Sequence, residues 1–405
     1  MTHICFVVDH FPVRSETFIR EQVIGLNRRG HRVSVLARGP GPGVTADEVG
    51  ELASQGVEIV SDCRLQGNRF GQAKQLASVV VRSPSMARWL KPSRPWHGRE
   101  AFDAYLRVES IRSLQPDVVH IHFGNRARPL QQIGLPCPVV VTWHGYDANV
   151  VPRMKGQDVY EALFAEPCVH TASSRFLCDR LRQLGAREEK TRVIPMGVDV
   201  RLFEFHPREI HANDPLRIVS VGRLDEMKGH QWLIRAVAEL LDEGESISLR
   251  IIGDGPLRSQ LETQINSCGR AAEIRLLGPQ PSAVVAEEMQ SAHLFALTGV
   301  VAENGRVETQ GVVFAEAQAC GLPVIGSVVG GVPESIVHGE TGLLCPPRDV
   351  PAVKDAIRSF RAPGKIAAFG RRGREFVESH FTNDLMLDRL ETVYRSLLAA
   401  EAPAE

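Results

Sequence analysis

Two glutamates, Glu308 and Glu316, stand eight positions apart in the stretch VETQGVVFAEAQACGLPVIG (307–326). If Gly311 opens a helix, Glu316 lies in that helix and Glu308 lies in the loop before it. A rise of about 1.5 Å per residue then spans about 12 Å, with the positive end of the helix dipole between the two. Each carboxylate can accept hydrogen bonds from two hydroxyls, which suits the diols of a ribose and of a hexose on either side of a diphosphate.

The alternative is structural: Glu308 interacts with the helix dipole and Glu316 lies on a solvated face. The neighbours of Glu316 argue against the second half of that alternative, because they are small or apolar on both sides. A carboxylate in such surroundings needs a partner.

Two cations follow a predicted strand in VSVGRLDEMKGH (219–230). Gly222 and Arg223 come directly after the strand, and Lys228 precedes the start of a helix. Cations at a helix N-terminus suit a pyrophosphate. A surface loop with two solvated charges is the competing interpretation.

Glycines mark two further turns. Gly253 and Gly255 stand between a strand and a helix in IIGDGPLRSQL, where they would permit close approach of a ligand or simply shape the turn. The third glycine of the dinucleotide fingerprint is absent. The prolines of GPGPG (39–43) remove N–H donors that a phosphate would need, so this stretch is predicted to be a loop.

A metal site at His120, His122, His144 and Asp147 is an alternative interpretation, because His120 and His122 share one face of a predicted strand. The predicted strand ends also suit a sugar, and Arg223 and Lys228 make a metal unnecessary. No metal and no other cofactor is expected.

The elements that position these residues alternate between apolar, Val- and Ile-rich runs and amphipathic stretches, which is typical of βαβ units on parallel sheets. The first unit has a helix N-cap at Ser15, a stripe of Ile19, Val23 and Leu26, and a stop at Gly30. The predicted strands are 3–8, 31–37, 117–123, 138–143, 168–173 and 191–196, and then 216–222, 248–253, 273–278, 292–298 and 322–327.

Length and composition predict two α/β domains. A chain of 405 residues exceeds one ordinary core, and the polar stretch 203–217 is predicted to be the linker. Lys plus Arg number 47 and Asp plus Glu 48, which argues against a general nucleic-acid binder. No apolar run approaches the roughly 20 residues of a membrane span, and the eight cysteines lack a CxxC motif. Reduced thiols in a cytoplasmic protein fit this cysteine pattern best. The N-terminus lacks a basic region and is predicted to be a first strand rather than a signal peptide.

The motifs together resemble the retaining glycosyltransferases of family 4. The resemblance rests on Gly222-Arg223 with Lys228, on Gly253 to Pro256, on the glutamate spacing and on EAQACGLPVIGSVVGGVPESIVHGETGLL. The stretches PMGVD (195–199) and TWHGYD (142–147) add N-terminal matches. HFPVRSETFIREQVIGLNRRGHRVSVL is similar to the branch of colanic-acid and other exopolysaccharide enzymes. Only 40–115 is not covered.

This resemblance implies the GT-B fold, with two doubly wound Rossmann-like domains facing across a cleft. The acceptor domain would comprise 1–203, the nucleotide-sugar domain 204–381, and a C-terminal helix in 382–405 would pack back on the first domain. Arg223 and Lys228 would bind the donor diphosphate, Glu316 the ribose and Glu308 the transferred sugar. The main-chain N–H groups of Gln310, Gly311 and Val312 would face sugar and phosphate, and His144 would reach the sugar.

One departure from the family pattern concerns the loop after the first strand, which is DHFPVRSET instead of a glycine-rich loop. Ser15 and Thr17 could replace its donors. Glu16 would then be a like charge near phosphate, and it could face either donor or acceptor.

The expected reaction moves a sugar from a nucleoside-diphosphate donor to a hydroxyl acceptor with retention. A nucleotide-sugar epimerase, a pyridoxal-dependent phosphorylase and a non-catalytic nucleotide-sugar sensor are the alternatives. Basic residues interleaved with tryptophans in 61–100 suggest peripheral contact with an anionic membrane that carries a lipid-linked acceptor, or else a solvated loop.

Overall fold

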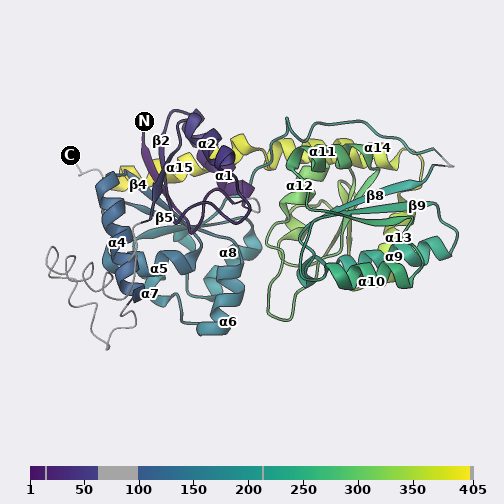
Figure 1. Cartoon of the computed structure of the whole chain (residues 1–405), viewed down its shortest axis with the longest axis horizontal. Helices are drawn as coiled ribbons and strands as arrows, with labels where there is room; N and C mark the ends of the chain where they lie inside the picture. The colour runs from purple at the N-terminus through teal and green to yellow at the C-terminus, as the bar shows by residue number, and fades with distance from the viewer. Residues whose placement is uncertain (14–15, 63–98, 212–213, 402–405) are drawn as a thin grey trace. The chain divides into compact units, whose positions relative to one another are not determined.

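The computed structural model describes residues 1–13, 16–62, 99–211 and 214–401, which fall into two compact units (Figure 1). Unit 1 comprises Met1–Ala172, Arg180–Val193 and Leu387–Glu405, and unit 2 comprises Ser173–Asp179 and Ile194–Met386. Each unit is built on one parallel sheet. The two predicted α/β sheets are therefore confirmed.

Unit 1 has a seven-stranded sheet in the order β3-β2-β1-β4-β5-β6-β7. Its strands are β1 His3–Val7, β2 Arg32–Ala37, β3 Glu58–Ser61, β4 Val118–His122, β5 Val139–Trp143, β6 Cys168–Ala172 and β7 Thr191–Val193. All six strands predicted for this half are present. The sequence missed β3, because this edge strand has only four residues, EIVS, and both of its ends are exposed.

The helices of unit 1 pack on both sides of this sheet (Figure 1). They are α1 Thr17–Arg28, α2 Ala46–Ser54, α4 Arg99–Leu114, α5 Gly124–Ile133, α6 Val151–Lys155 and α7 Glu161–Phe164, with short turns at Tyr146–Val150 and Glu188–Lys190. In α1 the predicted stripe of Ile19, Val23 and Leu26 is buried. The predicted N-cap, Ser15, lies outside the described residues.

Two helices pass from one unit to the other along the chain. Helix α8 (Arg175–Gln183) begins in unit 2 and ends in unit 1, and α15 (Asn383–Glu401) does the same. Within unit 1, α15 buries Leu390 and Tyr394, and the Tyr394 hydroxyl lies 2.6 Å from Nδ1 of His120 on β4. The C-terminal helix therefore supplies part of the core of unit 1.

Unit 2 has a six-stranded sheet in the order β10-β9-β8-β11-β12-β13. Its strands are β8 Leu216–Val221, β9 Ile247–Ile252, β10 Ile274–Gly278, β11 Leu294–Leu297, β12 Val324–Ser327 and β13 Gly342–Cys345. Its helices are α9 His230–Asp242, α10 Arg258–Ser267, α11 Ser282–Ser291, α12 Val312–Ala319, α13 Val350–Ser359 and α14 Lys365–His380, with short turns at Glu226–Lys228 and Val332–Glu334. The five predicted strands are present, and β13 was missed.

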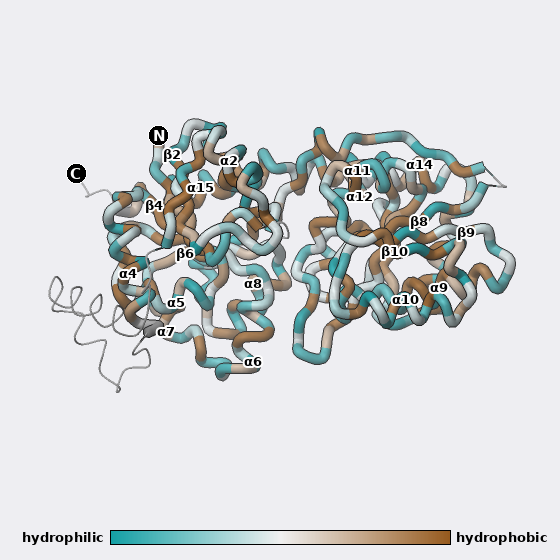
Figure 2. Tube along the Cα trace, in the orientation of Figure 1, coloured by the Kyte–Doolittle hydropathy of each residue, from teal (hydrophilic) through white to brown (hydrophobic). Residues whose placement is uncertain are grey.

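Alternate residues of the strands in unit 2 pack into two separate hydrophobic cores. In β8, Ile218 packs with α9, α10 and α13, while its neighbour Val219 packs with α11, α12 and α14. These two sets of helices lie on opposite faces of the sheet (Figure 1), and hydrophobic residues are concentrated in the strands (Figure 2). A sheet buried on both faces explains the nearly continuous apolar strand sequences.

The strand order reverses once in each sheet, between β1 and β4 in unit 1 and between β8 and β11 in unit 2. Ligands of such sheets bind beyond the carboxyl ends of the strands near this point. The loops after β8 and β11 carry the predicted donor residues, and the loop after β5 carries His144. No helix among the described residues is long and apolar enough to cross a membrane.

Candidate active site

The centre of the site in unit 2 is an ion pair between Lys228 and Glu308. Lys228 ends the short turn after β8, and Glu308 stands three residues before Gly311, which caps α12. The Lys228 ammonium contacts a Glu308 carboxylate oxygen, and the two side chains are only 16% and 15% exposed. Residues 80 positions apart in the chain are thus brought into direct contact.

Glycines allow the surrounding loops to close on this pair. A Cβ at Gly222 would lie 3.3 Å from Cδ of Lys228, so the lysine stem packs directly over the glycine. Gly330 has φ of +55°, and a Cβ there would lie 1.9 Å from the main-chain oxygen of Glu308. Any side chain at Gly330 would therefore displace the loop that carries Glu308.

The two glutamates have opposite electrostatic environments. Burial by itself would raise the pKa of Glu308, but the Lys228 ammonium and the nearby N–H groups of Thr309 and Gly311 outweigh burial and lower this pKa. Burial raises the pKa of Glu316 to about 7, and the charge of Lys228 offsets only part of that effect. Glu308 is therefore a carboxylate at neutral pH, whereas Glu316 is divided between its two protonation states.

The helix between the glutamates is the one predicted from the sequence. Gly311 caps α12 in the left-handed region, with φ of +77°, so Glu308 precedes the helix and Glu316 lies in it. The Gln310 side chain accepts from the main-chain N–H of Met196 at 2.8 Å and donates to its carbonyl at 3.0 Å. This bidentate contact fixes the entry into α12, and the N–H groups of Gly311 and Val312 belong to its first turn.

Arg223 stands apart from the ion pair. Its side chain is 64% exposed, and its nearest carboxylate is Asp225 at 3.9 Å. Asp225 is instead bound by Arg306 at 2.9 Å, with an Asp225 side chain that is only 7% exposed. Asp225 and Arg306 were not among the predicted site residues, although Asp225 lies between the two predicted cations Arg223 and Lys228 in the sequence.

Gly253 and Gly255 support the same loop from the neighbouring strand. A Cβ at Gly253 would lie 2.0 Å from the main-chain oxygen of Gly222, and one at Gly255 would lie 2.4 Å from that of Leu224. These glycines therefore let the turn after β9 pack against the turn after β8. The two glycines therefore shape the turn, as the structural interpretation predicts. Their contact also holds Gly222 under Lys228.

In unit 1, His144 follows β5 and closes a column of aromatic rings. Its Nε2 lies 2.9 Å from Nδ1 of His122, and its ring stacks on His122 with centroids 5.1 Å apart. The ring centroids of Phe18 and Phe123 lie 4.7 and 4.5 Å from the centroid of His144. Burial lowers the pKa of His144 to about 3, so the imidazole is neutral and can donate or accept one hydrogen bond.

The four residues of the alternative metal site have other hydrogen-bond partners. His120 contacts Tyr394 and Thr142, each at 2.6 Å, and one Asp147 oxygen accepts N–H groups of Gly145 and Ala148 at 2.9 and 3.1 Å. In the part of the chain that the structure describes, no group of three or more His, Cys, Asp or Glu side chains could hold a metal ion.

Two family models match successive parts of the chain. The model "Glycosyltransferase Family 4" matches residues 15–202, and the model "Glycosyl transferases group 1" matches residues 203–375. The chain belongs to the family 4 glycosyltransferases. The enzyme class and the family expected from the sequence are therefore confirmed.

Two relatives that align over nearly the whole chain are also glycosyltransferases. A putative colanic acid biosynthesis glycosyltransferase, WcaL of Escherichia coli K12, is 28% identical over 97% of this chain and 99% of its own. The amylovoran biosynthesis glycosyltransferase AmsK of Erwinia amylovora is also 28% identical, with the same coverage.

Solved structures share the fold of the glycosyltransferase. A glycosyltransferase from Rickettsia africae superposes with a TM-score of 0.74 at 18% identity, covering 98% of each chain. Anabaena Alr3699/HepE, solved in complex with UDP-glucose, superposes with a TM-score of 0.72 at 18% identity over 98% of this chain and 100% of its own. The expected GT-B fold class is thereby confirmed.

Proposed function

We propose that this glycosyltransferase moves a sugar from a nucleoside-diphosphate sugar to a hydroxyl of a saccharide or lipid-linked saccharide. The transfer retains the anomeric configuration and serves the synthesis of an exopolysaccharide or another cell-surface glycan. The observation that carries the proposal is the Lys228–Glu308 pair at the start of α12, with Glu316 in the same helix. A cation with two carboxylates nearby complements a diphosphate that is flanked by two sets of sugar hydroxyls. HepE, which shares the fold, has been solved with UDP-glucose, and the relatives WcaL and AmsK are named for exopolysaccharide synthesis.

Each residue then has a role set by its charge and position. Lys228 donates to the diphosphate, and Arg223, whose side chain is 64% exposed, approaches the same group from the surface. Glu316 accepts hydrogen bonds from the ribose hydroxyls, while Glu308 accepts from the transferred sugar. The N–H groups of Gln310, Gly311 and Val312 face sugar and phosphate, and the neutral His144 imidazole bonds a sugar hydroxyl.

The barrier to transfer is departure of the diphosphate from a centre that becomes oxocarbenium-like. Lys228, Arg223 and the N-terminus of α12 stabilise the negative charge that develops on the leaving oxygen. The leaving phosphate accepts the proton of the attacking hydroxyl on the same face of the sugar, which retains the anomeric configuration. Glu308 is held by Lys228 and acts as a hydrogen-bond acceptor rather than as a covalent nucleophile.

Turnover with and without an acceptor separates this function from its alternatives. Incubation with a panel of nucleotide sugars should release nucleoside diphosphate at a rate that a mixed saccharide acceptor increases. An epimerase would convert the donor to its epimer without an acceptor, and a non-catalytic sensor would bind the donor and leave it intact. Either of those results would overturn the proposal.

Transfer is expected to need no divalent metal. Lys228 and Arg223 supply the positive charge that a metal supplies in other enzymes, so EDTA should leave the rate unchanged. The control is EDTA with saturating magnesium or manganese added back. A tenfold loss in chelator that either ion restores would show that the cations are insufficient and that a metal takes part.

We propose that the basic and aromatic segment 61–100 holds this enzyme at the inner face of the plasma membrane, facing the cytoplasm. Residues 63–98 of this segment lie outside the described residues. Cations near anionic lipid contribute about 1 kcal/mol each. The protein should co-sediment with anionic liposomes, and rising salt should release it. If the intact protein stays in the supernatant at low salt, the segment has no membrane role.

A further inference from the structure

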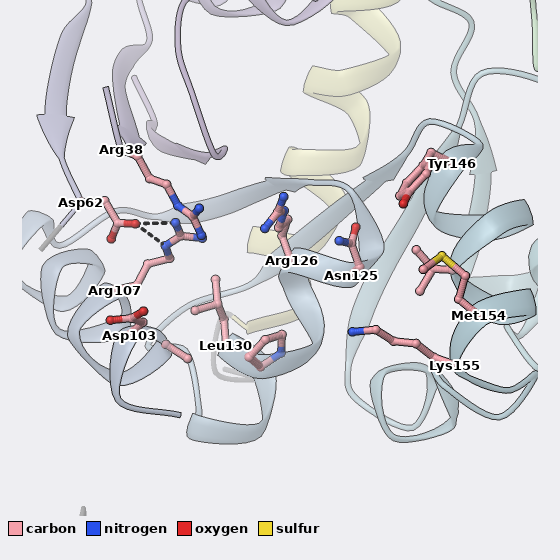
Figure 3. Close-up of a pocket in the computed structure, with 13 residues that line it drawn as sticks. Arg38, Asp62, Asp103, Arg107, Asn125, Arg126, Leu130, Tyr146, Met154 and Lys155 are labelled. Carbon is pink, nitrogen blue, oxygen red and sulfur yellow. Dashed lines mark hydrogen bonds and ion pairs between the residues drawn. The ribbon is translucent and has the colours of Figure 1, made fainter. Parts of the chain in front are cut away.

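A cavity of about 320 Å³ lies in unit 1. It is formed by residues that follow β2, β3, β4 and β5, and Figure 3 shows their side chains. Arg38 follows β2, Asp62 follows β3, Arg126 stands in the first turn of α5 after β4, and Tyr146 follows β5. Its volume is within the range of small-molecule sites. All of its lining residues belong to unit 1, whereas the Lys228–Glu308 pair belongs to unit 2.

One end of the cavity is a network of arginines around shared carboxylates. Asp9 lies 3.3 Å from Arg38 and 3.8 Å from Arg107, and it also contacts Arg126. Asp62 accepts from Nε of Arg107 at 3.0 Å. A single carboxylate shared by three guanidinium groups leaves their hydrogen-bonding capacity only partly used, because each guanidinium carries five N–H donors.

The cations of the cavity outnumber its carboxylates. Four cations line it, namely Arg38, Arg107, Arg126 and Lys155, and the carboxylates in or beside it are Asp9, Asp62 and Asp103. Lys155 makes no ion pair with any residue that the structure describes, and Figure 3 shows its ammonium directed toward the cavity. Among the residues that the structure describes, one positive charge of the cavity is therefore left without a counterpart.

Burial makes this excess positive charge costly. Burial lowers the pKa of Arg38, with Arg107 adding to the effect, and burial also lowers the pKa of Arg126. A lowered arginine pKa means that the surroundings do not fully compensate the positive charge. An anion in the cavity would supply that compensation.

The other end of the cavity has the features of a sugar-binding surface. Tyr146 is 48% exposed and Met154 is 70% exposed, and both line the cavity together with the Asn125 amide. The face of a tyrosine ring and a thioether suit the apolar C–H face of a sugar ring, and the amide can bond its hydroxyls. Tyr146 is also only two residues from His144.

We propose that this cavity binds an anionic group, a carboxylate or a phosphate, on the acceptor saccharide. The arginine network and Lys155 receive the anion, while Tyr146, Met154 and Asn125 hold the sugar that carries it. This inference rests on the proposed glycosyltransferase function and narrows its substrate to acidic acceptors. A uronic acid and a sugar phosphate share the required chemistry.

Three hexoses that differ only at C6 test the inference by ligand-observed NMR titration at low salt. The ligands are D-glucuronate, D-glucose 6-phosphate and D-glucose. At least one anionic hexose should bind about tenfold or more tightly than glucose, and the stronger of the two identifies the anion. Lys155→Glu should weaken that binding about tenfold, whereas Arg153→Glu, a matched charge reversal on the same helix α6, should change it little.

The outcomes separate this inference from the proposed function. Equal binding of all three hexoses, no binding of any, or a Lys155→Glu variant that binds like the wild type would each overturn the anionic acceptor. Nucleoside-diphosphate binding, measured in the same preparations, reports on unit 2 and should be the same in both variants. If nucleotide binding persists while the anions fail, the inference is wrong and the proposed function stands.

Discussion

Lys228→Met is expected to lower the rate of sugar transfer by about a hundredfold or more. Lys228 is the cation held inside the site by Glu308, with its side chain only 16% exposed. A charge-stabilising donor aimed at a leaving group contributes about 2.7–4 kcal/mol to the transition state, which corresponds to this loss of rate. Methionine keeps the length and packing of the lysine stem over Gly222, so the change removes mainly the charge.

Two further substitutions make the result specific. Arg235→Met removes a surface cation that pairs with Glu239 on α9, and it should leave the rate unchanged. Arg223→Ala should also lower the rate by about a hundredfold, even though its side chain is 64% exposed, because we propose that it binds the diphosphate. A loss below tenfold for Lys228→Met would show that the diphosphate is stabilised elsewhere.

Glu316→Ala is expected to weaken nucleotide binding by about tenfold to a hundredfold. The carboxylate is proposed to accept hydrogen bonds from the ribose, and hydrogen bonds to a charged group contribute roughly 1.5–3 kcal/mol. Glu308→Ala should preserve binding of the bare nucleoside diphosphate, because only the transferred sugar contacts it, and should lower turnover. Its loss also frees Lys228 from its ion pair, so nucleoside-diphosphate affinity should stay equal or increase.

Calorimetric titration of a nucleoside diphosphate into the two variants measures this difference. An equal loss of affinity in both variants would contradict the separate roles. The isosteric Glu308→Gln is the matched control, because it keeps the packing around Gly311 while it removes the charge and replaces one acceptor oxygen with an amide NH2 donor.

The pH dependence of binding gives a second measurement of the role of Glu316. Its pKa is raised to about 7, so the carboxylate form increases from about a tenth to about nine tenths between pH 6 and 8. Because the ionised form accepts both ribose hydroxyls, affinity for the donor should rise about tenfold over this range. A nucleoside-diphosphate sugar is the ligand of choice because it lacks a terminal phosphate that titrates near pH 6. Glu316→Gln should remove the dependence.

Much of the fold could be predicted because each βα unit is encoded locally. The stripe of Ile19, Val23 and Leu26 and the apolar strands stand close together in the sequence, and their periods distinguish helix from strand. The missed strands β3 and β13 have four residues each and pair at the edges of their sheets. Short edge strands lack the long apolar run that marks a strand buried on both faces.

The site was predicted residue by residue but not as a set of contacts. The sequence placed Glu308 before a helix and Glu316 within it, because both belong to one short stretch. It could not show that Lys228 pairs with Glu308, since 80 positions separate them and only the order of β8 and β11 brings their loops together. It likewise treated Arg223 and Lys228 alike, although one is exposed and the other is held inside the site.

The cavity of unit 1 was missed for the same reason. Its residues come from loops and from the helices α4, α5 and α6 between Arg38 and Lys155, and no two of its three arginines are close in the sequence. Periodicity and motif spacing report on single elements, whereas a site at the switch point of a sheet is assembled from loops that only the topology brings together.

The most direct test of the central claim is the effect of nucleotide sugars on the melting temperature of the protein. A panel of uridine, guanosine and adenosine diphosphate sugars is added to the wild type and to Glu316→Ala. A ligand at a hundred times its dissociation constant stabilises the folded state by about 2.7 kcal/mol, which raises the melting temperature by several degrees. The proposed function predicts such a shift for the sugars of at least one base and its loss in Glu316→Ala. No shift with any donor, or an equal shift in both proteins, would contradict it.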